Sequence, residues 1–198
     1  MRRCLVIDLD RCSGCDSCIV ACKIENGLDL GNYWNRVLTV GPTGTFPNIE
    51  QYYLPIQCQQ CENPQCVHVC PTGASYRDEK TGVVLVDKSK CIGCEYCMMA
   101  CPYGVRIMNE KEHVVEKCTL CSHLTADGSG VPACVHNCCC GARYFGDLDD
   151  PESDAAKAVA AAQAKDPDSV HHLPDPGDSR PATVYIMSKK TAEWKELV

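Results

Sequence analysis

Apolar residues along this chain form short runs rather than long periodic stretches, which predicts brief strands and helical turns. Runs rich in β-branched residues predict strands at 6–7, 36–40, 83–86 and 182–187. An alanine-rich segment predicts one longer helix, with Asp150 as its N-cap, Pro151 in its first turn and an end at Asp166-Pro167. This helix has few large apolar side chains to bury, so we expect a surface spacer.

Two segments lack a periodic pattern. Residues 23–57 are rich in Gly, Pro, Asn and Tyr and predict loops around the strand at 36–40. Within them, 31–49 is long enough to be an interface arm, and a surface insertion is the alternative. Residues 166–181 contain four prolines and predict turns.

The pattern contains neither a membrane-spanning segment nor an export signal. The sequence has no apolar run of about eighteen residues, so we expect no membrane span. Its start has two arginines but no apolar region before the first cysteine motif, so we expect no export signal there. The chain is then expected to be soluble, and either cytoplasmic or exported together with a partner that carries the export signal.

Cysteine changes this picture, because nineteen cysteines are present and sixteen fall into four groups of four. The groups are Cys12-Cys15-Cys18-Cys22, Cys58-Cys61-Cys66-Cys70, Cys91-Cys94-Cys97-Cys101 and Cys118-Cys121-Cys134-Cys138. The third group, followed by Pro102, has the spacing of bacterial ferredoxins, in which three thiolates hold one [4Fe–4S] cluster and the fourth binds a neighbouring cluster. The sequence therefore predicts clusters in pairs.

Two other uses of cysteine are less consistent with this pattern. A disulfide framework is typical of short cysteine-rich secreted chains, but here the number of cysteines is odd and no signal peptide is evident. Structural zinc sites also use C-x2-C pairs, but they need two separated pairs rather than three thiols in one loop. Zinc therefore remains an alternative mainly for the fourth group, whose middle members are far apart in the sequence.

Internal repeats indicate which groups share a cluster pair. Residues 8–12 are echoed by 87–91, and the segments 70–75, 101–106 and 138–143 align in register behind the fourth cysteines. This register pairs the second group with the third, and the first with the fourth. Four ligand sets follow: set A is Cys12, Cys15, Cys18 and Cys138; set B is Cys22, Cys118, Cys121 and Cys134; set C is Cys58, Cys61, Cys66 and Cys101; set D is Cys70, Cys91, Cys94 and Cys97.

The expected fold class is α+β, with two ferredoxin-like units of the βαβ type, one split around the other, and loop-rich insertions. The expected regions are 1–30 with 110–146 for the split unit, 50–109 for the second unit, 31–49 for the arm, and 147–198 for a helix, a loop and a return strand. Apolar residues make up 45% of the chain, but cysteine supplies much of this share. We therefore expect the clusters to replace part of the core, and the metal-free chain to be largely unfolded.

Other features narrow the function. The formal charge of −7 becomes more negative with thiolates, which argues against nucleic acid as a partner. No nucleophile with a base and no glycine-rich phosphate loop is evident, so we expect no catalytic residues. Cys4, Cys139 and Cys140 lie outside the four groups and are expected to be buried or free thiols. His68 and His136 stand between the third and fourth cysteines of their groups, where a hydrogen bond to a cluster sulfur is an option.

The four groups in this order, with the segment GARYFGDLDDP at 141–151, resemble the iron–sulfur (beta) subunits of the dimethyl-sulfoxide-reductase family of molybdenum or tungsten enzymes. The resemblance covers roughly residues 1–150 and the final strand. It implies four [4Fe–4S] clusters that relay electrons in anaerobic respiration, with the first/fourth half nearer the molybdenum. It also implies a large molybdopterin-containing catalytic subunit, often with a quinone-linked membrane anchor. Cys139 and Cys140 depart from the family pattern and leave open a ligand exchange at the Cys138 corner.

Two alternatives from other classes remain. A free-standing soluble polyferredoxin would shuttle electrons between redox partners by transient contact. A structural metal-binding module would hold zinc and would be colourless. The long segment 23–57 favours a permanent subunit, because a minimal ferredoxin does not need it. The sequence does not identify the substrate of the complex, the choice of Mo or W, or the direction of electron flow.

Overall fold

A four-stranded sheet joins the beginning of the chain to its later part. The computed structural model describes residues 1–188, and the sheet has the order β8-β1-β10-β9. Its strands are β1 (Arg3–Asp8), β8 (Arg143–Asp147), β9 (Val170–His171) and β10 (Val184–Ile186). β1 pairs in parallel with β10 and antiparallel with β8. The strands predicted at 6–7 and 182–187 are therefore present, while residues 189–198 of the expected C-terminal region lie outside the described part of the chain.

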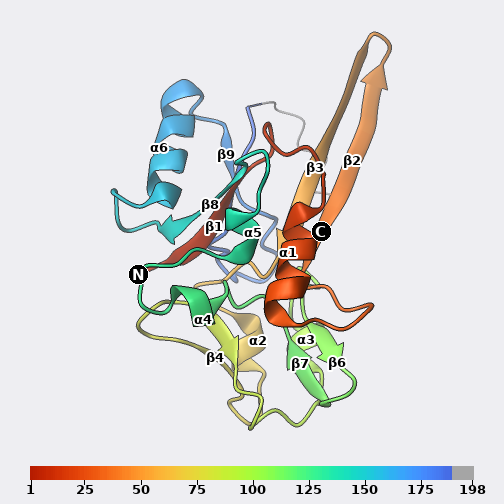
Figure 1. Cartoon of the computed structure of the whole chain (residues 1–198), viewed down its shortest axis with the longest axis vertical. Coiled ribbons are helices and arrows are strands. Elements are labelled where there is room, and N and C mark those ends of the chain that lie inside the picture. Colours follow the sequence, from red (N-terminus) through yellow and green to blue (C-terminus); the bar gives the residue numbers. More distant parts are fainter. Residues whose placement is uncertain (189–198) are drawn as a thin grey trace.

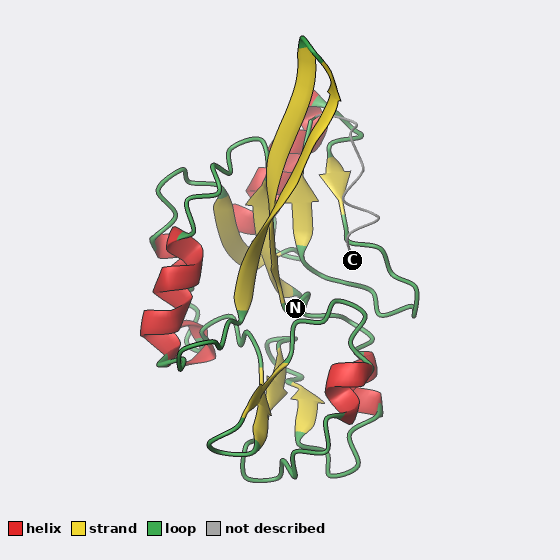
Figure 2. Cartoon of the chain, turned by 90° about the vertical axis from the view of Figure 1, so that its right-hand side faces the viewer, coloured by secondary structure: helices red, strands yellow, loops and turns green. Residues whose placement is uncertain are grey.

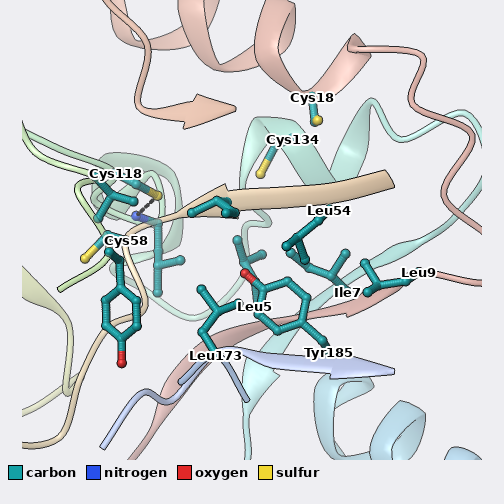
Figure 3. Close-up of a cluster of buried hydrophobic side chains, with 14 of the residues drawn as sticks. Leu5, Ile7, Leu9, Cys18, Leu54, Cys58, Cys118, Cys134, Leu173 and Tyr185 are labelled. Carbon is teal, nitrogen blue, oxygen red and sulfur yellow. Dashed lines mark hydrogen bonds between the residues drawn. The ribbon is translucent and has the colours of Figure 1, made fainter. Parts of the chain in front are cut away.

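Both faces of β1 are covered, as the alternation of its side chains requires. Leu5 and Ile7 are fully buried on one face, in the main apolar core together with Tyr185 of β10. The Tyr185 hydroxyl donates a hydrogen bond to the Pro55 carbonyl at 3.0 Å, so the phenol joins the sheet to the next segment. Figure 3 shows this core, with Cys18 and Cys134 at one border and Cys118 and Cys58 at another.

The opposite face of the sheet carries helix α6 (Asp154–Lys165), which corrects two expectations. The N-cap is Ser153, not Asp150: its hydroxyl accepts a hydrogen bond from the Ala156 N–H at 3.1 Å, and residues 150–153 form the turn before the helix. The helix is also no mere surface spacer. Ala155 is fully buried and packs with Val6 of β1, because alanines let the helix approach the sheet closely (Figure 1).

The segment predicted as loops contains instead a long hairpin of β2 (Asn35–Thr45) and β3 (Asn48–Gln57). The glycines and prolines between 41 and 47 do not interrupt pairing as expected, because they lie at a register shift between Val40 and Thr43 and at the end turn, while Pro55 stays within the paired part of β3 opposite Val37. Leu54 and Ile56 anchor its base in the core, whereas Phe46 near the tip is exposed. Figure 2 shows the hairpin extending well beyond the sheet.

Short elements carry most of the cysteines. The helices are α1 (Ser17–Asn26), α2 (Gln65–His68), α3 (Tyr96–Met99), α4 (Ser122–Thr125) and α5 (Ala133–His136). Two small hairpins are formed by β4 (Ser75–Arg77) with β5 (Val84–Val86), and by β6 (Ile107–Asn109) with β7 (Val114–Glu116). In Figure 1, α2, α3 and these hairpins occupy the end of the molecule opposite the tip of β2 and β3. Mixed helices and small sheets agree with the expected α+β class.

Candidate metal centres

The first and third cysteine groups lie in loops of the same backbone shape. Gly14 and Gly93, each between the first two cysteines of its group, have φ of 66° and 67°, in the left-handed region that favours glycine. A Cβ at Gly14 would lie 2.4 Å from the Tyr53 ring, and one at Gly93 would lie 2.7 Å from the His113 carbonyl oxygen. Glycine is required at both turns, and the loops curl so that three thiols face one space.

Each loop then enters a helix at its third cysteine. Cys18 lies in the first turn of α1, and Cys97 in the first turn of α3. Cys22, four residues after Cys18, therefore lies one turn further along the same helix. The prolines at 71 and 102 follow the ends of α2 and α3, where they prevent continuation.

Three of the four expected ligand sets line separate cavities. The empty space at these sites, open solvent included, is about 360 Å³ for set A, about 330 Å³ for set D and about 340 Å³ for set B. Each cavity is lined by all four cysteines of its set, which come from groups far apart in the sequence. The structure thus brings Cys138 to the first group, Cys22 to the fourth and Cys70 to the third.

The four cysteines of set C are also neighbours. Burial raises the pKa of Cys61, and the charges of Cys58, Cys66 and Cys101 raise it further. Burial likewise raises the pKa of Cys66, with additional contributions from Cys58 and Cys101 in the same direction. All four thiols of this set therefore lie within electrostatic reach of one another.

Two buried arginines are further residues of the site, and sequence reasoning did not assign them a role. Arg106 is only 4% exposed, and its Nη2 donates to Cys66 Sγ at 2.9 Å and to Ser75 Oγ at 2.8 Å. Arg143 is 5% exposed and donates to Asn35 Oδ1 at 3.0 Å. The register 101–106 and 138–143 places the two arginines at the same position of the repeat, which is a signal that the sequence did contain.

These arginines show that the thiol sets are built for negative charge. Burial opposes the charge on Arg106, but Cys66, Cys58 and Cys97 outweigh it and raise the pKa of the guanidinium. The pKa of Arg143 is raised in the same way by Cys134 and Cys18 against the effect of burial. Buried cations without counter-charges are costly, so the surrounding sulfurs are expected to be thiolates.

Unpaired donors around the cavities also suit a sulfur-rich cluster. The second terminal nitrogen, Nη1, of both Arg106 and Arg143 is buried without a hydrogen-bond partner within residues 1–188. Asn35 Nδ2 and Gln57 Nε2, which belong to residues lining the set B cavity, are in the same situation. Buried polar groups normally have partners, and the sulfides of an iron–sulfur cluster are acceptors of the right kind. The residues therefore fit the group that the cysteine spacing predicts.

A single metal ion fits less well. Throughout the described part, no three His, Cys, Asp or Glu side chains surround the position of one ion. Thiolates around one zinc, with Zn–S bonds of about 2.3 Å, must converge closely. A cubane binds its four thiolates to four different irons, so it accepts a wider arrangement. Burial raises the pKa of Cys22 to about 12, so this thiol stays protonated unless iron or another cation stabilises its thiolate.

Cysteines and histidines outside the sets have other surroundings. Cys4 is fully buried in β1 and packs against α6. Cys139 is exposed and Cys140 is half-buried, beside Cys15. His68 Nε2 lies 2.8 Å from Asn63 Oδ1, so a hydrogen bond from this ring to a cluster sulfur would have to come from Nδ1.

Comparison with known proteins agrees with this chemistry. Residues 49–148 match the family described as the 4Fe-4S dicluster domain. Across 96% of its length the chain is 45% identical to a Halobacterium salinarum protein named as an iron-sulfur subunit of dimethyl sulfoxide reductase, of which 82% is covered. It is 41% identical over 94% of its length to the B subunit of sulfite dehydrogenase from Allochromatium vinosum, of which 83% is covered. Identity to the B subunit of tetrathionate reductase from Salmonella typhimurium is 38%, with 93% of this chain and 72% of the relative covered.

The chain belongs to the iron–sulfur (beta) subunits of the dimethyl-sulfoxide-reductase family. Proteins of this family are electron-transfer subunits of oxidoreductase complexes rather than catalytic chains. The expected absence of a catalytic role agrees with this membership. No helix within residues 1–188 has both the length and the apolar character needed to cross a membrane.

Proposed function

We propose that this beta subunit holds four [4Fe–4S] clusters, in sets A to D, and relays electrons to or from a molybdopterin-containing catalytic subunit. When bound, such clusters accept and release single electrons. The residues of the chain itself have three tasks: they supply sixteen thiolates, exclude water from the inner sets, and surround the sulfurs with buried cations. The buried Lys117 contributes to the last task, since its charge opposes the rise that burial causes in the pKa of Cys66.

One observation carries this proposal: neighbouring sets lie next to one another in the order A, B, C, D, in shared apolar clusters and within electrostatic reach. Burial raises the pKa of Cys134 of set B, and charge on Cys18 of set A raises it further. Burial also raises the pKa of Cys118 of set B, to which Cys58 of set C contributes. Figure 3 shows the same two pairs side by side. Cys66 of set C and Cys97 of set D pack in one small apolar cluster. A continuous row of sets is what a relay requires.

The exposure of the cysteines along this row supports electron exchange with partner proteins at its two ends. All four cysteines of set B are buried, whereas Cys15 of set A and Cys94 of set D are exposed. Apolar side chains surround the second end, where Ile92 is 66% and Met99 is 73% exposed. Exposed apolar patches are typical of protein interfaces. By the resemblance described above, set A would face the catalytic subunit and set D the other electron partner, such as a quinone-linked membrane anchor.

The same proposal divides the chain into two ferredoxin-like units and an arm. Residues 50–109 contain sets C and D with α2, α3 and their hairpins, and would form one ferredoxin-like unit. Residues 1–30 with 110–146 contain sets A and B and would form the split unit. The arm at 31–49 contains β2 and the tip of the long hairpin, whose exposed Phe46 suits contact with a partner.

Anaerobic purification with an affinity tag on this chain tests the proposal. We expect a stable complex with a large pterin-bearing chain, and about sixteen irons with sixteen labile sulfides per beta subunit, as four cubanes require. Fewer than about twelve irons in fully loaded protein, or stoichiometric zinc, would reject the four clusters. A monomer with four reducible clusters would instead support a free-standing polyferredoxin.

A further inference from the structure

Two cysteines outside the proposed sets lie against the exposed corner of set A. The Sγ atoms of Cys15 and Cys139 are 3.3 Å apart, and those of Cys139 and Cys140 are 3.7 Å apart. Cys140 Sγ also lies 3.1 Å from the Ser13 hydroxyl, in the loop that carries Cys15. Three thiols thus gather where set A alone would need one.

Cys139 and Cys140 also lie at the mouth of the set A cavity. Cys140 lines the same cavity as the four cysteines of set A. Cys139 is exposed, like Cys15, so its side chain has room to rotate. A thiol that lies 3.3 Å from a ligand sulfur can replace it at the metal with a small movement, because no backbone segment has to shift.

The other cluster loops offer no such thiol. In the aligned segments, the positions of Cys139 and Cys140 are occupied by Pro71 and Thr72 after Cys70, and by Pro102 and Tyr103 after Cys101. Cys94 of set D is exposed as Cys15 is, and it stands at the same place in its own loop. Set D therefore provides an internal comparison that lacks the extra thiols.

We propose that Cys139 and Cys140 form a reserve ligand for the iron that Cys15 binds, an inference that rests on the ligand sets proposed above. In the exchange the iron–sulfur bond to Cys15 breaks and one to the incoming thiol forms. The proton of the incoming thiol passes to the Cys15 sulfur, so no oxidant or reductant is needed. The corner nearest solvent can then lose one ligand without losing its iron.

The exchange concerns the Cys15 corner and not the Cys138 corner that the sequence suggested. Cys138 Sγ accepts a hydrogen bond from the Ala142 N–H at 3.3 Å, which holds it in place. The contact of the extra thiols is with Cys15 across the cavity mouth, even though Cys139 follows Cys138 directly in the chain.

Alanine variants of the full chain, purified anaerobically, test this inference through iron and labile sulfide content and through electron paramagnetic resonance. Cys15→Ala should keep the iron content of the wild type, about sixteen per chain. Cys94→Ala should lose at least about one iron and show the signal of a three-iron cluster, because set D has no substitute. The triple variant Cys15→Ala, Cys139→Ala, Cys140→Ala should lose iron as Cys94→Ala does.

The double variant Cys139→Ala, Cys140→Ala is the control for folding, and it should remain fully loaded because Cys15 is present. Iron loss in Cys15→Ala equal to that in Cys94→Ala would overturn the inference. So would a triple variant as fully loaded as Cys15→Ala. If Cys94→Ala itself keeps every iron, the ligand assignment of set D is wrong, and the comparison of Cys15→Ala with the triple variant still decides on the reserve ligand.

Discussion

The buried Arg106 offers the sharpest test of how this chain tunes its centres. Replacing it in Arg106→Gln removes one positive charge, leaves a shorter side chain that still carries an amide donor, and leaves every proposed ligand in place. Its Nη2 lies 2.9 Å from Cys66 Sγ, and the side chain is only 4% exposed, so solvent screens it little. An electron added to a cluster in set C would be less stable without this cation, and the reduction potential must therefore become more negative.

The size of the effect follows from Coulomb's law. If the added electron is spread over a cluster centred about 6 Å from the guanidinium, an effective dielectric constant of about 20 gives an interaction of about 3 kcal/mol. For a one-electron couple, where about 59 mV corresponds to a factor of ten, this energy is about 120 mV. Relaxation of the protein and entry of water reduce the value, so we expect a shift of at least about 50 mV to lower potential.

Potentiometric titration followed by electron paramagnetic resonance measures this shift directly. Arg36→Gln is the matched control, because Arg36 is exposed and, among residues 1–188, donates to the carbonyls of Tyr103 and Gly104 rather than to a thiol. It makes the same change of charge, yet solvent screens it. Arg106→Lys keeps the charge and should shift the potential less than Arg106→Gln.

The reasoning would be refuted by a fully iron-loaded Arg106→Gln protein whose potentials match those of Arg36→Gln. A shift to higher potential would refute it as well. Loss of iron in Arg106→Gln would mean that the guanidinium is needed for assembly, and Arg106→Lys would then supply the measurement of potential.

Three further predictions concern assembly and packing. Cys22→Ala should remove the signal of the cluster held by Cys118, Cys121 and Cys134 and leave that of set A intact; loss of the set A signal instead would contradict the pairing. Burial raises the pKa of Cys22 to about 12, so protons compete with iron for this sulfur. Chelators should therefore extract iron faster at about pH 6 than at about pH 8; a rate independent of pH would argue against thiolate ligation. Ala155→Leu should destabilise the loaded protein by about 1–3 kcal/mol in denaturant unfolding at unchanged iron content, because Ala155 is fully buried against the sheet; an unchanged midpoint would show that α6 is free to move away.

The cysteine groups could be predicted from the sequence because spacing alone dictates which thiols one loop can present. The aligned segments likewise predicted which distant cysteines meet, and the structure brings Cys22 beside Cys118 and Cys134 in one cavity. Residues that act by burial were harder to predict. Arg106 and Arg143 occupy the same place in the repeat, but a charged residue in a sequence is normally expected at the surface.

Backbone features were missed for a different reason. Glycine and proline between 41 and 47 predicted loops, yet a hairpin tolerates them at a register shift and at its end. Asp150 and Ser153 are both good N-caps, and sequence alone does not decide between them. The alanines of α6 have little apolar area each, so their sequence did not indicate that Ala155 would be fully buried.

The split arrangement of sets A and B has a consequence for the order in which a growing chain is completed. On the proposed ligand assignment, sets C and D need only residues up to Cys101, so their ligands would all be available before the last half of the chain has left the ribosome. Set B must wait for Cys134 and set A for Cys138, while Cys12, Cys15, Cys18 and Cys22 have been waiting since the start of synthesis. Those four early thiols are the ones that a cell must shield from oxidation and from stray metals the longest. Iron content of chains stalled on the ribosome with residues up to about 110 outside the exit tunnel would measure this order, with about eight irons expected from two cubanes.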